Sequence, residues 1–354
     1  MSVSPFDHPL LSGLVGDAEI GACFSAEADI AEMLVFERSL AKAQADEGLI
    51  PFEAAQAIAD AVAAFHPDMD GLRNGVARDG VVVPELVKQL RAAVGEPHAA
   101  QVHFGATSQD VVDTSLALRL RHVTRFLAAR LADLIDQLDA LNARDGTIEV
   151  MAHTRMQAAI PVPASRKILS WRDPLQRHWG RLKEIEDELA VLTLGGAAGT
   201  LEKLGGSGEA VSRGLAHALG LRAVPRPCHN ERDGLAEFAS WLSLASGSLG
   251  KMGQDIALMA QNEIGEVKLA SGGGSSAMPH KLNPVGAEVL VTLARFNATL
   301  VSGMHHALVH ENERSGSAWT LEWMILPQMA VATGAALATA QRLVAGLEFA
   351  RRDT

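Results

Sequence analysis

The chain has 354 residues, of which 48% are hydrophobic and none is tyrosine, and its formal net charge is −11. This length permits a large buried core, whereas the acidic balance argues against general nucleic-acid binding, which needs a basic face. The sequence holds neither an uninterrupted run of eighteen apolar residues nor a basic leader followed by an apolar stretch. We therefore expect a cytoplasmic protein without membrane segments. Two distant cysteines, Cys23 and Cys228, offer no disulfide framework.

The first hundred residues break into short helical pieces around four prolines, Pro51, Pro67, Pro84 and Pro97. Three valines at 81–83 give a weak strand signal, but Pro84 follows at once and a helical pattern comes next. We expect residues 1–104 to form a smaller helical domain, with a boundary near Gly105.

Long helical patterns dominate the rest of the chain. Apolar residues recur at intervals of three and four over 112–142, over 235–260 and from Pro284 to Leu308. About thirty residues make a helix roughly 45 Å long. The sequence therefore predicts an all-α fold with a long-helix bundle over 105–340 and a residual C-terminal stub over 341–354. Such rods favour a core completed by a homotetramer, and a monomeric bundle of kinked helices is the alternative.

Four polar stretches interrupt these patterns, and the first is "HFGATSQDVVDT" at 103–114. Gly105 allows a turn, after which Thr107, Ser108 or Asp110 can cap the following helix. A helix N-terminus with free N–H groups and two hydroxyls also suits a carboxylate. We predict that His103, Thr107 and Ser108 bind substrate, with helix capping as the structural alternative.

The second stretch, "MAHTRMQAAIPVP" at 151–163, places four polar side chains in five positions: His153, Thr154, Arg155 and Gln157. On a helix they would point around most of the circumference, so an extended or irregular segment lining a cleft is favoured. The alternative is that they only satisfy buried backbone groups.

The third stretch, "GGGSSAMPHKLNP" at 272–284, cannot continue a helix, because each Gly costs about 1 kcal/mol there and each Pro about 3. Lys281 and Asn283 supply a charge and an amide close to the helix start at Pro284. We predict a mobile loop that closes over a bound ligand and carries its own reactive groups. A plain linker would hardly need this order of residues.

The fourth stretch, "HENERSGSAWTLEWMILP" at 310–327, follows the end of a long helix. Arg314 could bind a substrate carboxylate in bidentate fashion. Alternatively, Glu311, Glu313 and Arg314 form a surface ion-pair cluster that contributes little.

A metal site and a nucleotide site are both disfavoured by the spacing of the residues. His306 and His310 have ligand spacing, with Glu311 adjacent, but the zinc-protease pattern needs Glu where Ala307 stands. The glycines of "LGGAAGT" at 194–200 do not have dinucleotide-binding spacing. We expect neither a metal ion nor a cofactor.

Taken together, the stretches resemble the fumarase/aspartase superfamily, whose members are helical tetramers that eliminate across a carbon–carbon bond. Its signature G-S-S-x-M-P-x-K-x-N is matched by Gly274, Ser275, Ser276, Met278, Pro279, Lys281 and Asn283. The stretches at 195–200 and 261–267 also fit, so the resemblance covers nearly the whole chain. Within the superfamily, 37–51, 77–90, 103–114 and 311–327 are similar to the bacterial branch that lactonizes 3-carboxy-cis,cis-muconate, and adenylosuccinate lyases are next.

This resemblance implies a cofactor-independent cycloisomerase acting on a small polyanionic carboxylate through an enediolate-like intermediate. By matching position, Ser275 is the catalytic acid or base, with Lys281 and loop amides stabilising its alkoxide. The substrate would be bound by residues from all four stretches, namely His103, Thr107, Ser108, His153, Thr154, Gln157, Ser276, Met278, Asn283 and Arg314. Each pocket would combine residues of more than one subunit. A sulfomuconate substrate, a fumarate-releasing lyase and a non-catalytic structural tetramer are the alternatives.

Two features depart from the superfamily pattern. Arg155 stands where relatives usually have a catalytic His, which leaves the identity of the proton donor open and makes Arg155 a catalytic candidate itself. The small C-terminal domain of relatives is expected to be absent or reduced here.

Overall fold

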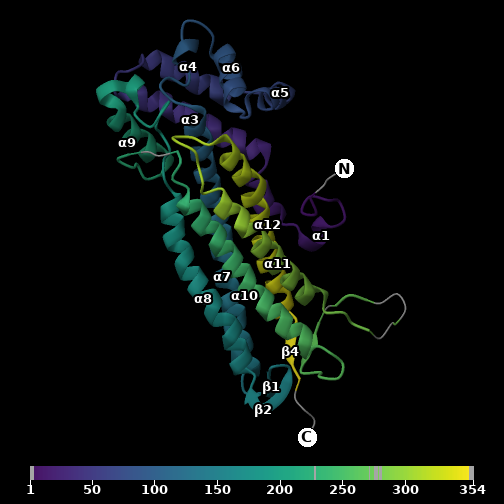
Figure 1. Cartoon of the computed structure of the whole chain (residues 1–354). Helices are drawn as coiled ribbons and strands as arrows, with labels where there is room; N and C mark the ends of the chain where they lie inside the picture. The colour runs from purple at the N-terminus through teal and green to yellow at the C-terminus, as the bar shows by residue number, and fades with distance from the viewer. Residues whose placement is uncertain (1–3, 227–228, 271, 275–277, 279–280, 351–354) are drawn as a thin grey trace.

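The computed structural model describes residues 4–226, 229–270, 272–274, 278 and 281–350. Its main body is a bundle of long helices that run lengthwise beside one another (Figure 1). They are α7 (Ser108–Asp145), α8 (Ser165–Leu189), α10 (Asp233–Met259), α11 (Val285–His306) and α12 (Gly316–Ala345). The predicted all-α class is confirmed, and the three predicted long helices correspond to α7, α10 and α11.

Helix α7 shows why the spacing of apolar residues gives this bundle. Leu127, Leu131, Leu134 and Leu138 follow one another at three- and four-residue intervals, and each is fully buried against the other long helices. Burying one such side chain contributes about 1.5–3 kcal/mol. The same core takes Trp171 from α8 and Trp241 from α10, so the bundle has one continuous apolar interior.

Helices α10 and α11 cross at very short range because glycines leave room for the neighbouring backbone. A Cβ atom on Gly253 would lie 2.5 Å from the Ala287 carbonyl oxygen, and one on Gly250 would meet the Ala294 Cβ. No side chain can be accommodated at either position without moving α11.

A second apolar core lies at one end of the bundle, where Figure 1 shows the shorter helices gathered around the start of α7. It includes side chains from α3 (Ala26–Asp46), α4 (Phe52–Ala63), α6 (Val83–Val94) and α9 (Gly208–Leu219). Helix α5 (Met69–Asp79) and the 3₁₀ segments Ala99–Gln101 and Glu202–Ser207 complete this end. The valine run at 81–83 leads into α6, in agreement with the helical prediction.

The two cores do not divide the chain at a single point. Residues 192–221 return to the second core, whereas Ile20 of α2 (Ala18–Ala22), which follows α1 (Ser12–Val15), packs in the main core. The boundary at Gly105 stays a prediction. Residues 341–349 do not stand apart from the bundle, because they complete α12 and add a strand whose Leu347 is fully buried.

Two small antiparallel sheets close the opposite end of the bundle (Figure 1). Strands β1 (Glu149–Thr154) and β2 (Gln157–Pro163) form a hairpin, and β3 (Val267–Leu269) pairs with β4 (Leu347–Phe349). The hairpin turn is Arg155–Met156, with φ angles of 50° and 66°. These left-handed angles suit a two-residue hairpin turn but are uncommon for residues other than glycine and asparagine.

By length and composition, α11 and α12 would each be long and apolar enough to cross a membrane. The most apolar window of α12 is 72% buried inside the bundle, which identifies it as a core helix. The corresponding window of α11 is only 28% buried in the single chain.

Candidate active site

The start of α7 is built around a buried carboxylate. Thr107 is the N-cap residue, and the Asp110 carboxylate accepts a hydrogen bond of 2.9 Å from the Thr107 N–H. The same carboxylate accepts from the N–H groups of Gly195 and Gly196 at 2.8 and 3.0 Å. Asp110 therefore ties the "GGAAGT" stretch to the helix start, and the expected capping role of this region is confirmed.

Arg314 reaches this helix start from the segment between α11 and α12. Its Nη1 donates to Thr107 Oγ1 at 3.2 Å, its Nε to Gln109 Oε1 at 3.1 Å, and its Nη2 to the Ala197 carbonyl at 3.3 Å. The structure thus brings together two of the predicted residues, Thr107 and Arg314. With its N–H groups engaged in this way, the guanidinium does not present a free bidentate face in this conformation.

The alternative of a surface ion-pair cluster at 311–314 does not match the contacts. In the described part of the chain, no ion pair joins Arg314 to Glu311 or Glu313. Hydrogen bonding from Ser315 and from its own backbone N–H lowers the pKa of Glu311, so this carboxylate helps to order the segment that carries Arg314.

Behind Gln109 lies a buried ionic triad. The Asp113 carboxylate accepts from Arg232 Nη1 at 2.6 Å and from Trp319 Nε1 at 3.0 Å, and Arg232 Nη2 also donates to Glu322 at 2.5 Å. The two carboxylates on either side raise the pKa of Arg232 despite its burial, so the cation persists at all ordinary pH values. This triad fixes α7, α10 and α12 against one another beneath the helix start.

His103 is engaged by a carboxylate on α3, and its predicted part in substrate binding stays a prediction. Its Nδ1 lies 2.6 Å from the Glu37 carboxylate on α3, and the side chain is largely buried. Burial alone would lower the pKa of His103, but the adjacent Glu37 outweighs it and raises this pKa above its ordinary value. The contact joins α3 to the turn before α7.

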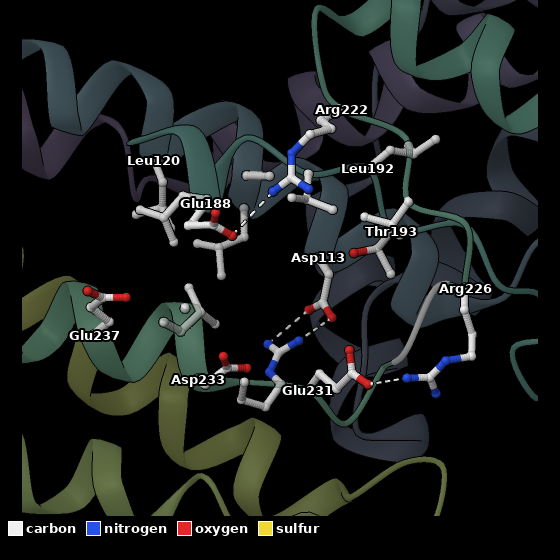
Figure 2. A pocket seen from close by; sticks show the side chains of 18 residues that line it. Asp113, Leu120, Glu188, Leu192, Thr193, Arg222, Arg226, Glu231, Asp233 and Glu237 are labelled. Atoms are coloured by element: carbon white, nitrogen blue, oxygen red, sulfur yellow. Dashed lines mark hydrogen bonds and ion pairs between the residues drawn. The ribbon is translucent and has the colours of Figure 1, made fainter. Parts of the chain in front are cut away.

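A cavity of about 400 Å³ opens near the triad, between α7, the end of α8 and the start of α10 (Figure 2). Its charged rim is paired, since Arg222 lies 3.3 Å from Glu188 and Arg226 lies 2.9 Å from Glu231. Asp233 adds negative charge at the same mouth. Because this charge balance disfavours an anion, we do not assign the substrate to this cavity.

The second predicted stretch forms the β1–β2 hairpin, so the expectation of an extended segment is confirmed. His153, Thr154, Arg155 and Gln157 are all exposed, which argues against a role in satisfying buried backbone groups. His153 borders an open cavity of about 640 Å³ between the hairpin, α8 and α10. The charged residues of this cavity are Arg166, Lys167, Lys251, Asp173 and Asp255.

The third predicted stretch leaves the bundle just before α11 (Figure 1). Gly273 and Asn283 exchange two backbone hydrogen bonds of 2.9 Å, which bring the two ends of the loop together. Lys281 and Asn283 follow on the side nearer α11. Ser275, Ser276 and Pro279 lie outside the described residues. Met278 is exposed, and its carbonyl accepts a hydrogen bond of 3.0 Å from the Lys281 N–H. Closure of the loop over a ligand stays a prediction.

These stretches lie at opposite ends of the bundle. Helix α7 has 38 residues, which corresponds to about 57 Å between Thr107 and the hairpin that follows its last turn. Gly286 packs near Leu343 in the last turns of α12, whereas Arg314 precedes the first turn of that helix. A single chain therefore cannot gather the three stretches around one ligand.

Sequence reasoning missed two residues at or beside the start of α7, Gln109 and His229. It also missed that Asp110 binds the glycine stretch at 195–200. His229 Nε2 lies 2.7 Å from Asp110, and the imidazole is buried. A signal was present for Asp110 and Asp113, because two acids three residues apart among valines are hard to bury unpaired. Nothing in the sequence identifies their partners from outside α7, which lie more than eighty residues away.

Across the described ranges of the chain, no group of three His, Cys, Asp or Glu side chains lies close enough to hold a metal ion. The His310 side chain is buried, with its Nε2 3.6 Å from Glu322, whereas His306 is exposed at the end of α11. The two histidines therefore do not face a common point in this chain.

Comparison with known proteins gives consistent matches over most of the chain. A family model described as lyase matches residues 21–299. A 3-carboxy-cis,cis-muconate cycloisomerase of Pseudomonas putida is 40% identical over 331 residues, which cover 92% of this chain and 78% of the relative.

Solved structures agree with this assignment. The 3-carboxy-cis,cis-muconate lactonizing enzyme of Pseudomonas putida superposes with a TM-score of 0.91 at 38% identity, covering 97% of this chain and 78% of that one. A fumarate lyase of Mesorhizobium sp. BNC1 superposes with a TM-score of 0.88 at 34% identity, covering 94% and 76%. With the shared fold and the loop signature, these matches show that the chain belongs to this lyase family, the fumarase/aspartase superfamily.

Proposed function

We propose that the protein is a cofactor-independent cycloisomerase that converts 3-carboxy-cis,cis-muconate into 4-carboxymuconolactone. The observation that carries this proposal is the 40% identity, over 92% of the chain, to a Pseudomonas putida enzyme of that name. The polar groups at the start of α7 and in the loop before α11 supply the donors that a tricarboxylate requires.

In the proposed reaction, one carboxylate oxygen of the diene adds to the alkene carbon conjugated with another carboxyl group. A five-membered lactone closes, and the neighbouring carbon takes up one proton, so substrate and product are isomers. The nucleophile is already ionised and needs no base. The demanding step is the extra negative charge on the conjugated carboxyl group, which hydrogen-bond donors and cations must stabilise.

The residues of this chain divide these tasks. Ser275 delivers the proton, and Lys281 stabilises the alkoxide that the serine forms. Thr107 and Asn283 bind carboxylates, and Arg155 holds or polarises a further one. The left-handed backbone at Arg155 supports a functional role, since such conformations cost energy and gather at ligand sites.

The proposal requires more than one subunit at each site. The three stretches lie about 57 Å apart along α7 or at opposite ends of α12, so neighbouring antiparallel bundles must bring them together. The low burial of the apolar α11 in the single chain supports subunit packing along this helix. We propose a homotetramer in which sites are shared between subunits, located in the cytoplasm.

A direct assay tests the activity. The protein is mixed with 3-carboxy-cis,cis-muconate without added metal or nucleotide, and loss of the conjugated-diene absorbance is followed. We expect turnover by the natural chain and a loss of about 10²-fold or more in kcat for Ser275→Ala, in line with removal of a general acid. Robust turnover by Ser275→Ala would remove this residue from its assigned role.

A substrate panel separates the competing activities. The structural similarity to a fumarate lyase favours an elimination reaction as the second candidate. Adenylosuccinate, unsubstituted muconate and 3-sulfomuconate are therefore compared with 3-carboxymuconate at equal concentration. Preferential release of fumarate would replace the cycloisomerase assignment, and absence of turnover throughout the panel would favour a structural role.

A further inference from the structure

Arg314 is held far more firmly than an exposed loop arginine usually is. It lies on the segment between α11 and α12 and remains exposed, yet all three guanidinium nitrogens meet protein acceptors. His229 Nδ1 lies 3.5 Å from Nη2 as a fourth and longer contact. Together these contacts hold the guanidinium in one orientation.

Gln109 has only one orientation that satisfies its neighbours. Its Nε2 donates to the His229 carbonyl at 2.9 Å and to Asp113 Oδ2 at 3.1 Å, and both of these groups are pure acceptors. The Oε1 atom must therefore face Arg314. Because Asp113 is itself held by Arg232 and Trp319, the amide cannot rotate without leaving buried groups unpaired.

His229 is constrained in the same way from the other side. Its Nε2 faces the Asp110 carboxylate at 2.7 Å, so the proton resides on Nε2 and Nδ1 offers a lone pair to Arg314. Asp110 is fixed in turn by the backbone N–H groups of Thr107, Gly195 and Gly196. Both constraints on Arg314 thus lead back to carboxylates buried in the first two turns of α7.

Arg314 and Thr107 each keep one hydrogen-bond donor that these contacts do not use. Arg314 has five N–H donors, and the four contacts leave one of them on Nη1. Thr107 Oγ1 accepts from that same nitrogen, so its hydroxyl proton can be donated outward. The two donors are adjacent and can serve one carboxylate group together.

We propose that Gln109 and His229 are positioning residues, which hold the Arg314 guanidinium against Thr107 so that this pair receives one substrate carboxylate. The inference deepens the proposed function and rests on it. Neither residue contacts the substrate. Each acts through Arg314, with Gln109 as the stronger contact and His229 as the weaker one.

A double-mutant cycle tests this coupling. Gln109→Leu, Arg314→Leu and the double variant are compared in the 3-carboxymuconate assay. For Gln109→Leu we expect KM to rise about tenfold with kcat nearly unchanged. The substitution weakens the charged hydrogen bond from Arg314 to a substrate carboxylate, and this carboxylate is bound equally in the ground state and the transition state. In the Arg314→Leu background, Gln109→Leu should have no further effect on KM. His229→Leu should raise KM less than Gln109→Leu does.

Stability is measured in parallel to exclude a purely structural role. Asn297→Leu is the matched control, because Asn297 is an equally buried amide that bonds Ser246 and Thr333 in the bundle. It should lower the free energy of unfolding without raising KM. An unchanged KM for Gln109→Leu, or the same increment with and without Arg314, would overturn the proposal.

The test survives a failure of the proposed function. If the natural chain does not turn over 3-carboxymuconate, that function is wrong, and the same cycle is run on the affinity for propane-1,2,3-tricarboxylate by titration calorimetry. Non-additive weakening by Gln109→Leu and Arg314→Leu would still support the positioning role. Additive weakening, or no measurable binding by the natural chain, would overturn it.

Discussion

At the scale of single residues, helix capping was predictable from the sequence, whereas the hydrogen bonds and ion pairs between residues far apart in the chain were not. Thr107 and Asp110 carry a local signal, because small polar residues before an apolar helix satisfy free N–H groups whatever the tertiary fold. The pairing of His103 with Glu37 bridges 66 positions, and the pairing of Arg232 with Asp113 bridges 119. Such contacts depend on how helices pack, which one sequence does not encode locally.

The His103–Glu37 contact makes stability depend on pH. The folded state raises the pKa of His103, so the protonated imidazole stabilises the fold below its unfolded pKa and loses this effect as pH rises through the folded value. His103→Asn should therefore lower the free energy of unfolding more at about pH 6 than at about pH 9. Urea unfolding at both pH values measures the difference. An equal effect of His103→Asn at the two pH values would contradict the assignment.

At the scale of elements, the long helices were predicted from the spacing of apolar residues, because a spacing of three or four positions places these residues on one face of an α-helix. The β1–β2 hairpin was predicted merely as an extended stretch. Its turn lacks the usual residues, since Arg155 and Met156 occupy positions where glycine or asparagine is common. The close crossing of α10 and α11 was not predicted either, because a helical glycine by itself does not indicate what lies opposite.

The crossing at Gly253 predicts a reversal of the usual glycine rule. Alanine normally stabilises a helix interior over glycine by about 0.5–1 kcal/mol. At Gly253 the added Cβ would lie 2.5 Å from the Ala287 carbonyl oxygen, so Gly253→Ala should instead destabilise by about 1–3 kcal/mol. Gly180→Ala on the exposed face of α8, where no atom lies within 4 Å, should be stabilising. Unfolding free energies in urea measure both, and equal signs would contradict the close crossing.

At the scale of the whole molecule, the bundle, the family and the need for more than one subunit at each pocket were predicted from the sequence, whereas the positions of the stretches along the helices were not. In the sequence, the loop signature and the start of α7 each carry enough polar groups to suggest a binding site of their own. Only the 38-residue length of α7 and the direction of α12 reveal that they belong to separate ends.

The proposed sharing of sites between subunits predicts complementation. At a substrate concentration well below KM, Thr107→Val should have little activity as a pure protein because its KM is raised, and Lys281→Met because its kcat is lowered. When the two are unfolded together at equal amounts and refolded, random assembly should leave about one quarter of the sites with both natural residues. The recovered diene-consuming activity measures this fraction. Each variant refolded alone is the control, and a mixture no more active than the controls would argue for sites within single subunits.

The last strand carries a further consequence for the whole molecule. Strand β4 pairs residue by residue with β3, the Ala270 N–H donates to the Gly346 carbonyl at 2.8 Å, and Phe349 stacks on Trp171 of α8. Strand β4 thus anchors the segment that leads into the loop at 272–284. Removal of residues from the carboxyl end past Phe349 should weaken the anchoring of this loop without removing any residue of the loop. Partial digestion by a carboxypeptidase should therefore lower the enzymatic activity before the protein unfolds.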